Sequence, residues 1–478
     1  MTGCTVRLTI FTSLLAIGLL AAGASFANNL TVLEGATLID GTGGEPMPNA
    51  VVVIDGNSIS AIGASGKVEY PPDANVQDVS GQYIIPGLID MHAHVPVGPF
   101  IAEQVDGMMR MRVRYDASAS AQFLQTLLAL GITTARSTAG LTAESVGLKK
   151  AIAAGDLRGP ELFVAGNVID TPPSYWIGDF VSEVQTESEI REEVRRQTLA
   201  GVDFVKLYIG LPPKLVCAGI EEAHANGIKA LGHLAATSWT TAGKCQIDGL
   251  VHGIPASAEL LPPAQRAEYK KYPDMRTFYK WPQLVDLDGG EIDELLETLV
   301  AQKVAIDPTL VLFEAVFWGD HPSYAAHPEL ALTPAVVVDG WKQGGHSSGW
   351  TPEEFAQAKA TWPKVLAFTK KMYDRGVLIL AGSDTPNPFV IPGVSFHREL
   401  ELLVDAGLTP AQVLKIATHN GAQALGVLDN TGTVEAGKRA DLVVLSANPL
   451  EDIRNTRKIT HVYKGGAVFD PQALLGLQ

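Results

Sequence analysis

Two histidines stand one residue apart in the stretch GLIDMHAHV, residues 87–95. Successive side chains of a β-strand alternate between its two faces, so His92 and His94 point the same way. Two imidazoles on one face can bind one cation together. The alternative is a pair of polar residues at a point where a strand meets solvent. The stretch by itself leaves both interpretations open.

Further polar residues lie in or at the ends of other apolar, strand-like runs. Lys206 is in VDFVKLYI, His233 ends IKALGHL, His252 is in QIDGLVHGI and Asp384 is in VLILAGSDT. A polar group buried without a partner costs several kcal/mol, so these side chains need a shared explanation. A metal centre is the simplest one.

The elements that must position these residues alternate strand-like and helix-like segments across residues 86–428. This alternation predicts a (β/α)8 TIM barrel, in which the carboxyl ends of all strands form one rim and the eighth strand lies beside the first. Two long connections, 255–299 and 313–364, follow predicted strands and are expected over that rim. The predicted strands are YIIPGLIDMHAHV, GITTARST, ELFVAGNVI, VDFVKLYI, IKALGHL, QIDGLVHGI, KVAIDPTL and VLILAGSDT.

The two ends of the mature chain differ in sequence pattern from the alternating central region. Residues 28–85 and 429–478 contain short β-rich runs separated by Gly, Asp and Asn, which are typical turn residues. We expect both ends to join in one small β-sandwich domain beside the barrel. With 478 residues, the chain has enough length for both units.

Residues 1–27 are typical of a signal peptide. Arg7 precedes the apolar run LTIFTSLLAIGLLAAG, and ASFA supplies a cleavage site before Asn28. We therefore expect an exported, periplasmic or secreted protein with no membrane attachment after cleavage; a retained anchor is the alternative. Only Cys217 and Cys245 follow the segment, and two separate thiols are favoured over a bridge between them. The net charge of −16 argues against a nucleic-acid partner.

The motifs PGLIDMHAHV, GITTARST, FVKLY, GLVHGI, LAGSDT and GTVEAGKRADLVVL occur in this order. Together they resemble the metal-dependent amidohydrolase superfamily, in its carboxylated-lysine, two-metal branch. The imidazolonepropionase-like and prolidase-like members are the most similar. The resemblance spans residues 30–469, nearly the whole mature chain.

The resemblance implies a site with two divalent metal ions, of which zinc is the expected one and manganese, cobalt and iron are alternatives. Lys206 resembles the lysine that reacts with carbon dioxide to give a carbamate bridging both metals. Asp384 resembles the residue that carries a proton from the attacking hydroxide to the leaving amine. The implied ligands are His92, His94 and Asp384 for the first metal, His233 and His252 for the second, and Lys206 for both.

The resemblance further implies hydrolysis of a small-molecule amide, either a dipeptide, as in prolidases, or an N-acyl amino acid. A lactonase or organophosphate esterase on the same centre, a one-metal deaminase and a non-catalytic binding protein are the alternatives. Val251 stands where some relatives have an acid, and LYIGLPPK where some have a Gly-rich run. A homo-oligomer is compatible with the sequence.

Three residues are candidates for substrate binding. Arg136 ends the second predicted strand and could hold a carboxylate, or form an ion pair with a neighbouring acid. Tyr208 shares a strand face with Lys206 and could donate to a substrate oxygen, or pack in the core. His397 follows Asp384 closely enough to line the pocket, although a structural role at a helix start is favoured. The other histidines, His346 among them, are expected at the surface or in packing.

Overall fold

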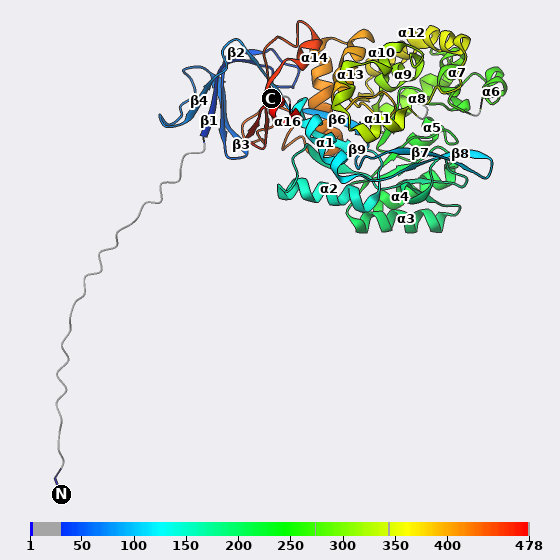
Figure 1. The fold of residues 1–478 in the computed structure, drawn as a ribbon, viewed down its shortest axis with the longest axis horizontal. Helices are drawn as coiled ribbons and strands as arrows, with labels where there is room; N and C mark the ends of the chain where they lie inside the picture. Colours follow the sequence, from blue (N-terminus) through cyan, green and yellow to red (C-terminus); the bar gives the residue numbers. More distant parts are fainter. Residues whose placement is uncertain (3–29, 273, 343–344, 477–478) are drawn as a thin grey trace.

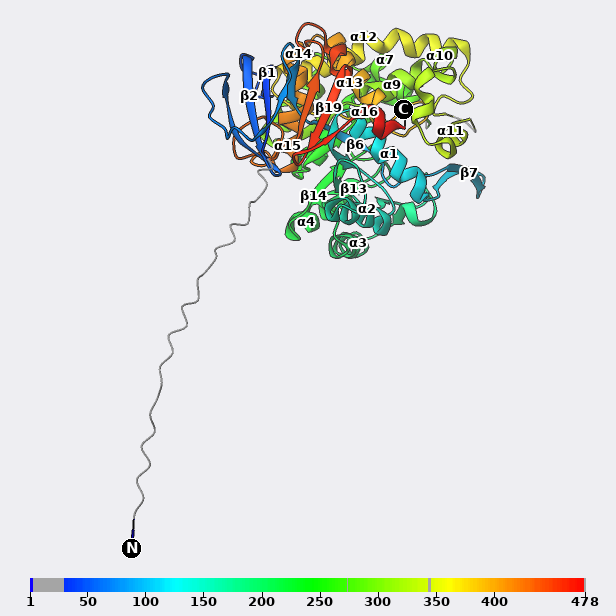
Figure 2. The same ribbon diagram turned by 60° about the vertical axis from the view of Figure 1, so that its left-hand side comes forward.

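The computed structural model describes residues 1–2, 30–272, 274–342 and 345–476, so nearly all of the predicted signal peptide lies outside it. The fold is mixed α/β. A sheet built from the two ends of the chain lies beside a larger body of parallel strands and helices (Figures 1 and 2). No helix among the described residues combines the length and the apolar character that crossing a membrane requires.

Eight strands from both ends of the chain share one sheet. Its order is β20-β19-β18-β5-β1-β2-β3, and β4 pairs with β1. The antiparallel pairing of β5 with β18 joins the two ends. A single sheet path is observed, and the two-layer sandwich stays a prediction. The strands are β1 (Leu30–Leu38), β2 (Met47–Asp55), β3 (Ser58–Ala64), β4 (Asn75–Asp78), β5 (Tyr83–Pro86), β18 (Leu442–Leu445), β19 (Ile459–Lys464) and β20 (Ala467–Phe469).

The larger body contains parallel strands at all eight places where the sequence predicts them. One sheet has the order β10-β9-β6, and a second has the order β12-β11-β13-β14-β15-β16-β17. Isolated parallel bridges link Ala165 to Phe204 and Ala93 to Thr385, between the two sheets. The strands are β6 (Leu88–Ala93), β9 (Ile132–Ser137), β10 (Glu161–Val164), β11 (Val168–Asp170), β12 (Val181–Glu183), β13 (Phe204–Leu207), β14 (Lys229–Gly232), β15 (Gly249–Val251), β16 (Ala305–Asp307) and β17 (Leu378–Ile379).

Helices connect these strands, and their ends follow from local sequence. In α3 (Glu187–Ala200) the Thr186 and Glu189 side chains form a capping box, and Gly201 ends the helix with φ of 101°. The other helices in and between the parallel strands are α1 (Ala117–Ala129), α2 (Thr142–Ala154), α4 (Pro213–Ala225), α5 (Trp239–Lys244), α8 (Gly290–Ala301), α9 (Leu310–Phe317), α12 (Pro352–Asp374) and α13 (Val394–Asp405).

The two long connections are largely helical. The first carries η2 (Ala258–Leu260), α6 (Pro263–Tyr269) and α7 (Thr277–Leu284), and the second carries α10 (Pro322–Ala325), η3 (Pro328–Leu332) and α11 (Ala335–Trp341). The remaining short elements are η1 (Gly178–Phe180), α14 (Pro410–Lys415), η4 (Ile416–Asn420), α15 (Gly421–Leu425), η5 (Ile453–Arg457) and α16 (Pro471–Leu475).

A hairpin that the sequence did not predict is inserted between β6 and α1. It consists of β7 (Phe100–Val105) and β8 (Met108–Val113), which pair antiparallel and project from the larger body (Figure 1). A parallel bridge joins its residue Met111 to Trp176, in the loop after β11. The hairpin therefore holds that loop in place.

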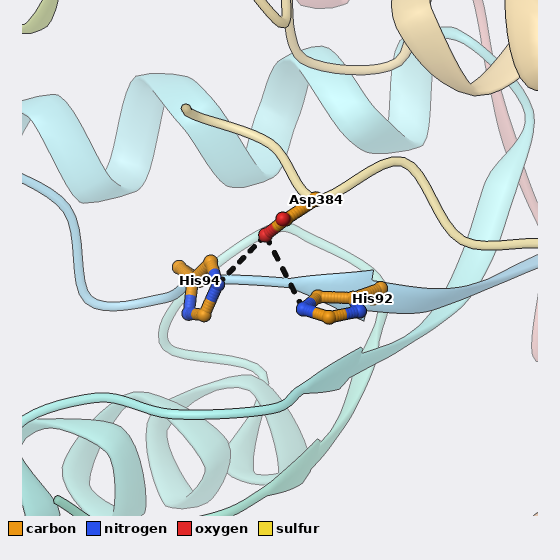
Figure 3. A group of neighbouring side chains, drawn as sticks. All are labelled: His92, His94 and Asp384. Carbon is orange, nitrogen blue, oxygen red and sulfur yellow. Dashed lines mark hydrogen bonds and ion pairs between the residues drawn. The ribbon is translucent and has the colours of Figure 1, made fainter. Parts of the chain in front are cut away.

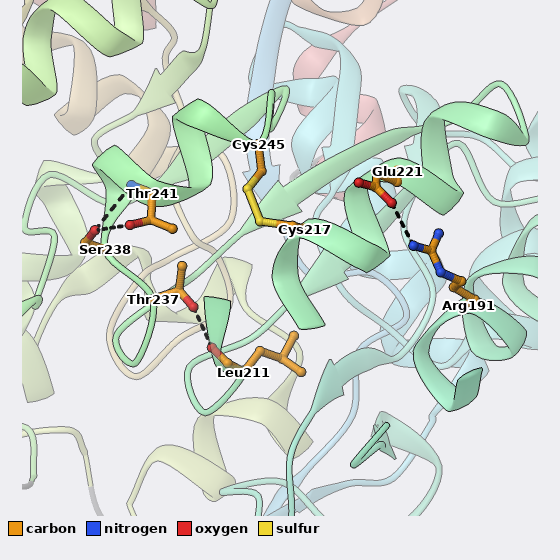
Figure 4. Close-up of a disulfide and its surroundings, with 8 residues drawn as sticks. All are labelled: Arg191, Leu211, Cys217, Glu221, Thr237, Ser238, Thr241 and Cys245. Carbon is orange, nitrogen blue, oxygen red and sulfur yellow. Dashed lines mark hydrogen bonds and ion pairs between the residues drawn. A yellow bond between two sulfur atoms is a disulfide. The ribbon is translucent and has the colours of Figure 1, made fainter. Parts of the chain in front are cut away.

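Cys217 and Cys245 form a disulfide, which corrects the expectation of two separate thiols (Figure 4). Cys217 lies on α4 and Cys245 caps α5, and their Cα atoms are 5.3 Å apart. The sequence could not show this because the distance depends on how two successive helices pack. A bridge across 28 residues stabilises the fold by about 3–4 kcal/mol in the loop-entropy model.

Candidate metal centre

His92, His94 and Asp384 converge at one end of the parallel strands (Figure 3). His92 lies in β6, His94 follows it, and Asp384 comes shortly after β17. The Asp384 backbone N–H donates to the His92 carbonyl over 2.7 Å, which brings the two segments together. Asp384 Oδ1 is 3.2 Å from His92 Nε2 and 2.9 Å from His94 Nε2. Potential ligand atoms of the three residues all lie within 4.8 Å of one another.

Both histidine rings are oriented through their other nitrogen. His92 Nδ1 is 2.5 Å from Asp307 Oδ1, and His94 Nδ1 is 3.1 Å from the Ala139 carbonyl oxygen. A carbonyl and a carboxylate accept, so each Nδ1 donates and the Nε2 atom of each ring faces Asp384. A cation bound between the two Nε2 atoms and the carboxylate would be held by all three groups. This is the arrangement of a metal ligand with its supporting acceptor.

His233, His252 and Lys206 line the same pocket as His92, His94 and Asp384. His252 Nε2 is 3.1 Å from His233 Nδ1, and the ring centroids of His252 and His92 are 5.1 Å apart. Thr309 Oγ1 is 2.8 Å from His252 Nδ1 and orients that ring. Lys206 extends from β13 and is buried. The structure thus brings together all six residues that the sequence placed in a metal centre.

Burial favours the uncharged forms of these nitrogen groups. It lowers the pKa of Lys206 to about 8, although the carboxylates of Asp307 and Asp384 oppose the shift. Burial also lowers the pKa of His92, His233 and His252 well below the ordinary imidazole value. Neutral imidazoles are the form that binds a metal, and a neutral amine is the form that can react with carbon dioxide.

Two of the residues have a backbone conformation that non-glycine residues seldom adopt. His252 has φ of 78° and Asp384 has φ of 63°. Each costs of order 1–3 kcal/mol and persists only where the surroundings hold it. Such outliers gather at functional sites, and here they aim two side chains at one point.

A pocket opens onto the cluster, and its walls are mostly apolar. Phe100 and Val113 come from the β7–β8 hairpin, and Trp176 and Phe180 come from the segment after β11. Met275, Phe278 and Leu312 line the pocket too. Other aromatic residues of the two long connections, Tyr279, Trp281 and Phe317, are buried in the core.

Tyr208 lines this pocket, on the face shared with Lys206. Its ring centroid is 5.1 Å from that of His233, and its hydroxyl accepts a hydrogen bond from Trp176 Nε1 over 3.1 Å. The phenol proton is then available for a substrate oxygen. Burial raises the pKa of Tyr208, so the hydroxyl remains protonated.

Arg136 is not brought to the pocket, which corrects its assignment as a substrate residue. Its Nη2 donates to Asp307 Oδ2 over 2.6 Å and its Nε donates to the Met91 carbonyl over 2.7 Å. The guanidinium is 2% exposed, so it has no free face for a substrate. The ion pair that the sequence offered as the alternative is the one observed.

His397 is also absent from the lining of the pocket among the described residues. It lies on α13, where its ring bonds to Thr456 Oγ1 over 2.9 Å and to the Leu130 carbonyl over 3.0 Å. Thr456 belongs to η5 and Leu130 caps α1, so both ring nitrogens of His397 have structural partners.

Asp307 and His346 are the residues that sequence reasoning missed. Asp307 ends β16, so the rule that selected the other strand-end polar residues applies to it as well. His346 lines the pocket and its Nε2 is 2.9 Å from Asn387 Oδ1. It lies in a long connection without a periodic pattern, and no sequence signal distinguishes it.

The model of the amidohydrolase family matches residues 83–246 and 363–468, more than half of the chain. The chain belongs to the amidohydrolase family. The resemblance seen in its motifs is therefore confirmed at the family level, and the protein is a hydrolase. The matched segments include His92, His94, Lys206, His233 and Asp384, whereas His252 and Asp307 lie between them.

Individual relatives of this amidohydrolase are distant in sequence. Ochratoxinase of Aspergillus niger is 23% identical over 92% of this chain and 86% of its own length. Imidazolonepropionase of Cutibacterium acnes is 24% identical over 84% of each chain. The crystal structure of a Xaa-Pro dipeptidase with bound methionine covers 92% of this chain and all of its own, with 22% identity and a TM-score of 0.67. The likeness to the dipeptidase structure supports the fold.

Asp307→Asn is expected to lower the metal affinity of this amidohydrolase about 10- to 100-fold, because His92 loses the acceptor that orients it. Competition with a chelator measures the change. Asp248→Asn is the matched control, because Asp248 also accepts from a histidine, His224, but at the opposite end of the strands. Equal affinities of the two variants would contradict the orienting role of Asp307.

Proposed function

We propose that this amidohydrolase cleaves an amide bond at a centre of two divalent metal ions. His92, His94 and Asp384 would hold one ion, His233 and His252 the other, and Lys206 both. The observation that carries the proposal is the convergence of the Nε2 atoms of His92 and His94 on Asp384 Oδ1. Each ring is held in this orientation by an acceptor at its Nδ1 atom. Such a set of imidazole and carboxylate donors suits a divalent cation.

We infer that the parallel strands close into a (β/α)8 barrel. The two isolated bridges support this, because they connect β6 with the segment after β17 and the end of β10 with β13. Closure explains how Asp384 meets His92 despite nearly 300 intervening residues.

Lys206 fits the role of a bridging ligand only after modification. An ammonium group carries donors alone and repels a cation. The neutral amine attacks carbon dioxide and releases one proton, and the resulting carbamate would offer an oxygen to each metal ion. The burial of Lys206 and the lowered pKa of its amine support this step.

When bound, the metal ions supply Lewis acidity toward the carbonyl and lower the pKa of a water molecule toward neutrality. Asp384 accepts the proton of the attacking water and delivers it to the leaving nitrogen. Tyr208 donates a hydrogen bond through its phenol O–H to an oxygen of the substrate. The amide gains one water, and a carboxylic acid and an amine leave.

The substrate candidates are a dipeptide, as in prolidases, or an N-acyl amino acid. The names of the relatives, a Xaa-Pro dipeptidase and an ochratoxinase, support an amide. A lactonase or organophosphate esterase is the second candidate, because the same centre serves both reactions.

We further propose that the protein is exported and that residues 1–27 are removed. The Cys217–Cys245 bridge supports export, because disulfides persist in oxidising compartments.

Elemental analysis of the mature protein, purified and then loaded with zinc or manganese in bicarbonate, tests the centre. About two metal atoms per chain are expected, together with hydrolysis of members of a panel of dipeptides, N-acyl amino acids and lactones. One atom per chain indicates a one-metal deaminase. None, without hydrolysis of any substrate, overturns the proposal in favour of a binding protein.

A further inference from the structure

Outside the proposed metal centre, the described lining of the pocket offers no arginine or lysine that could pair with a carboxylate. Among its described lining residues there is no arginine, and the only lysine is Lys206, which lies within the metal centre. Arg136 was a candidate for this role in the sequence, but its guanidinium donates to Asp307 Oδ2 and to the Met91 carbonyl oxygen. A carboxylate that contacts these walls away from the metal centre loses water and gains no charge partner among them, which is strongly unfavourable.

The walls instead present aromatic faces. The ring centroid of Trp176 is 4.4 Å from that of Phe180 and 6.1 Å from that of Phe100. The bridge between Met111 and Trp176 fixes this group to the hairpin. Rings held in this way bind flat apolar groups by offset or edge-to-face contacts.

The polar groups along the same walls are hydrogen-bonding groups from tyrosine, asparagine and histidine side chains. Tyr208 can donate its phenol proton, and Asn387 Nδ2 donates to the Asp384 carbonyl oxygen over 2.8 Å. His346 contacts Asn387 Oδ1 through Nε2. These groups suit amide oxygens and nitrogens, and the net charge of −16 adds no attraction for an anion.

We propose that the preferred substrates are uncharged amides that carry an aromatic or similarly bulky apolar group and no free carboxylate beside the scissile bond. This deepens the proposed function and rests on it. It removes free dipeptides and N-acyl amino acids from the preferred class and keeps amide hydrolysis at the same centre.

A matched pair of substrates tests the proposal on the metal-loaded protein. N-acetyl-phenethylamine and N-acetylphenylalanine share the scissile amide and the phenyl group, and differ by one carboxylate. Both release acetate, which is measured at pH 8, where an ordinary imidazole is uncharged. We expect kcat/KM to be at least tenfold higher for the uncharged amide. An equal or higher value for N-acetylphenylalanine overturns the inference and leaves the proposed amide hydrolysis intact.

Trp176→Ala should reduce kcat/KM for N-acetyl-phenethylamine about tenfold and change that for N-acetyl-ethylamine little, because the smaller amide has no ring to contact the wall. Phe469→Leu, on β20 in the terminal sheet, is the control and should match the unaltered protein. An equal loss on both amides in Trp176→Ala would contradict the aromatic contact.

Calorimetric binding of the same pair separates the two proposals. If no amide is hydrolysed, the proposed function fails. Tighter binding of N-acetyl-phenethylamine than of N-acetylphenylalanine would then still support the inferred pocket chemistry, and the reverse order would overturn it.

Discussion

Lys206→Ala is expected to lower amide hydrolysis at least about a thousandfold, because a lost metal removes several kcal/mol of transition-state stabilisation. The metal content should fall from about two atoms per chain to one or fewer. Short carboxylic acids such as formate or propionate should restore part of both, since a carboxylate fits the space of the missing carbamate. Elemental analysis and initial rates, with and without the acid, measure these changes.

The control for this substitution is Lys229→Ala. Lys229 is the first residue of β14 and is partly buried. Its Nζ donates to the Ala424 carbonyl oxygen, at the end of the strands that lies away from the metal centre. It should retain both metals and full activity. If Lys206→Ala behaves as Lys229→Ala does, Lys206 does not bridge metals and the two-metal model is wrong.

Asp384→Asn is expected to reduce kcat by about 10³- to 10⁴-fold, in the upper range for a lost general acid–base group. The amide oxygen of asparagine can still face a metal, so most of the metal content should remain. Burial opposes the shift, but His92 and His94 lower the pKa of Asp384, so its carboxylate is ionised throughout pH 5–9 and the loss should be similar across that range. The readouts are the rate between pH 5 and pH 9 and the metal content of each sample.

Asp441→Asn provides a buried-carboxylate control in the terminal sheet, where Asp441 is paired with Arg439. Any loss of stability there should leave the pH profile unchanged. Retention of metal with an unaltered rate in Asp384→Asn would show that another group moves the proton.

Periodicity in the chain predicted the strands of the larger body well. All eight predicted runs contain parallel strands, because short apolar segments between helices have few other stable arrangements. From the rule that the carboxyl ends of the strands meet on one rim, His92, Lys206 and Asp384 were expected to lie close together, and they line one pocket. The same rule would have selected Asp307.

Side-chain orientation and long-range packing were harder to predict. Arg136 was expected at a substrate, but the acid that pairs with it lies 171 residues away in the chain. Cys217 and Cys245 pair because α4 and α5 pack side by side, which their spacing does not show. The β7–β8 hairpin has no counterpart in the repeating pattern, and it supplies one wall of the pocket.

The sequence by itself determined the residue types of the centre, the order of the strands that carry them and the membership of a hydrolase family. These follow from local periodicity and from motifs, which are properties of short segments. Only the tertiary structure decided which partner each side chain takes, that Asp307 orients His92 and pairs with Arg136, and that the described pocket walls are aromatic and contain no arginine. Those features depend on contacts between segments far apart in the chain, where burial and geometry select one partner among many.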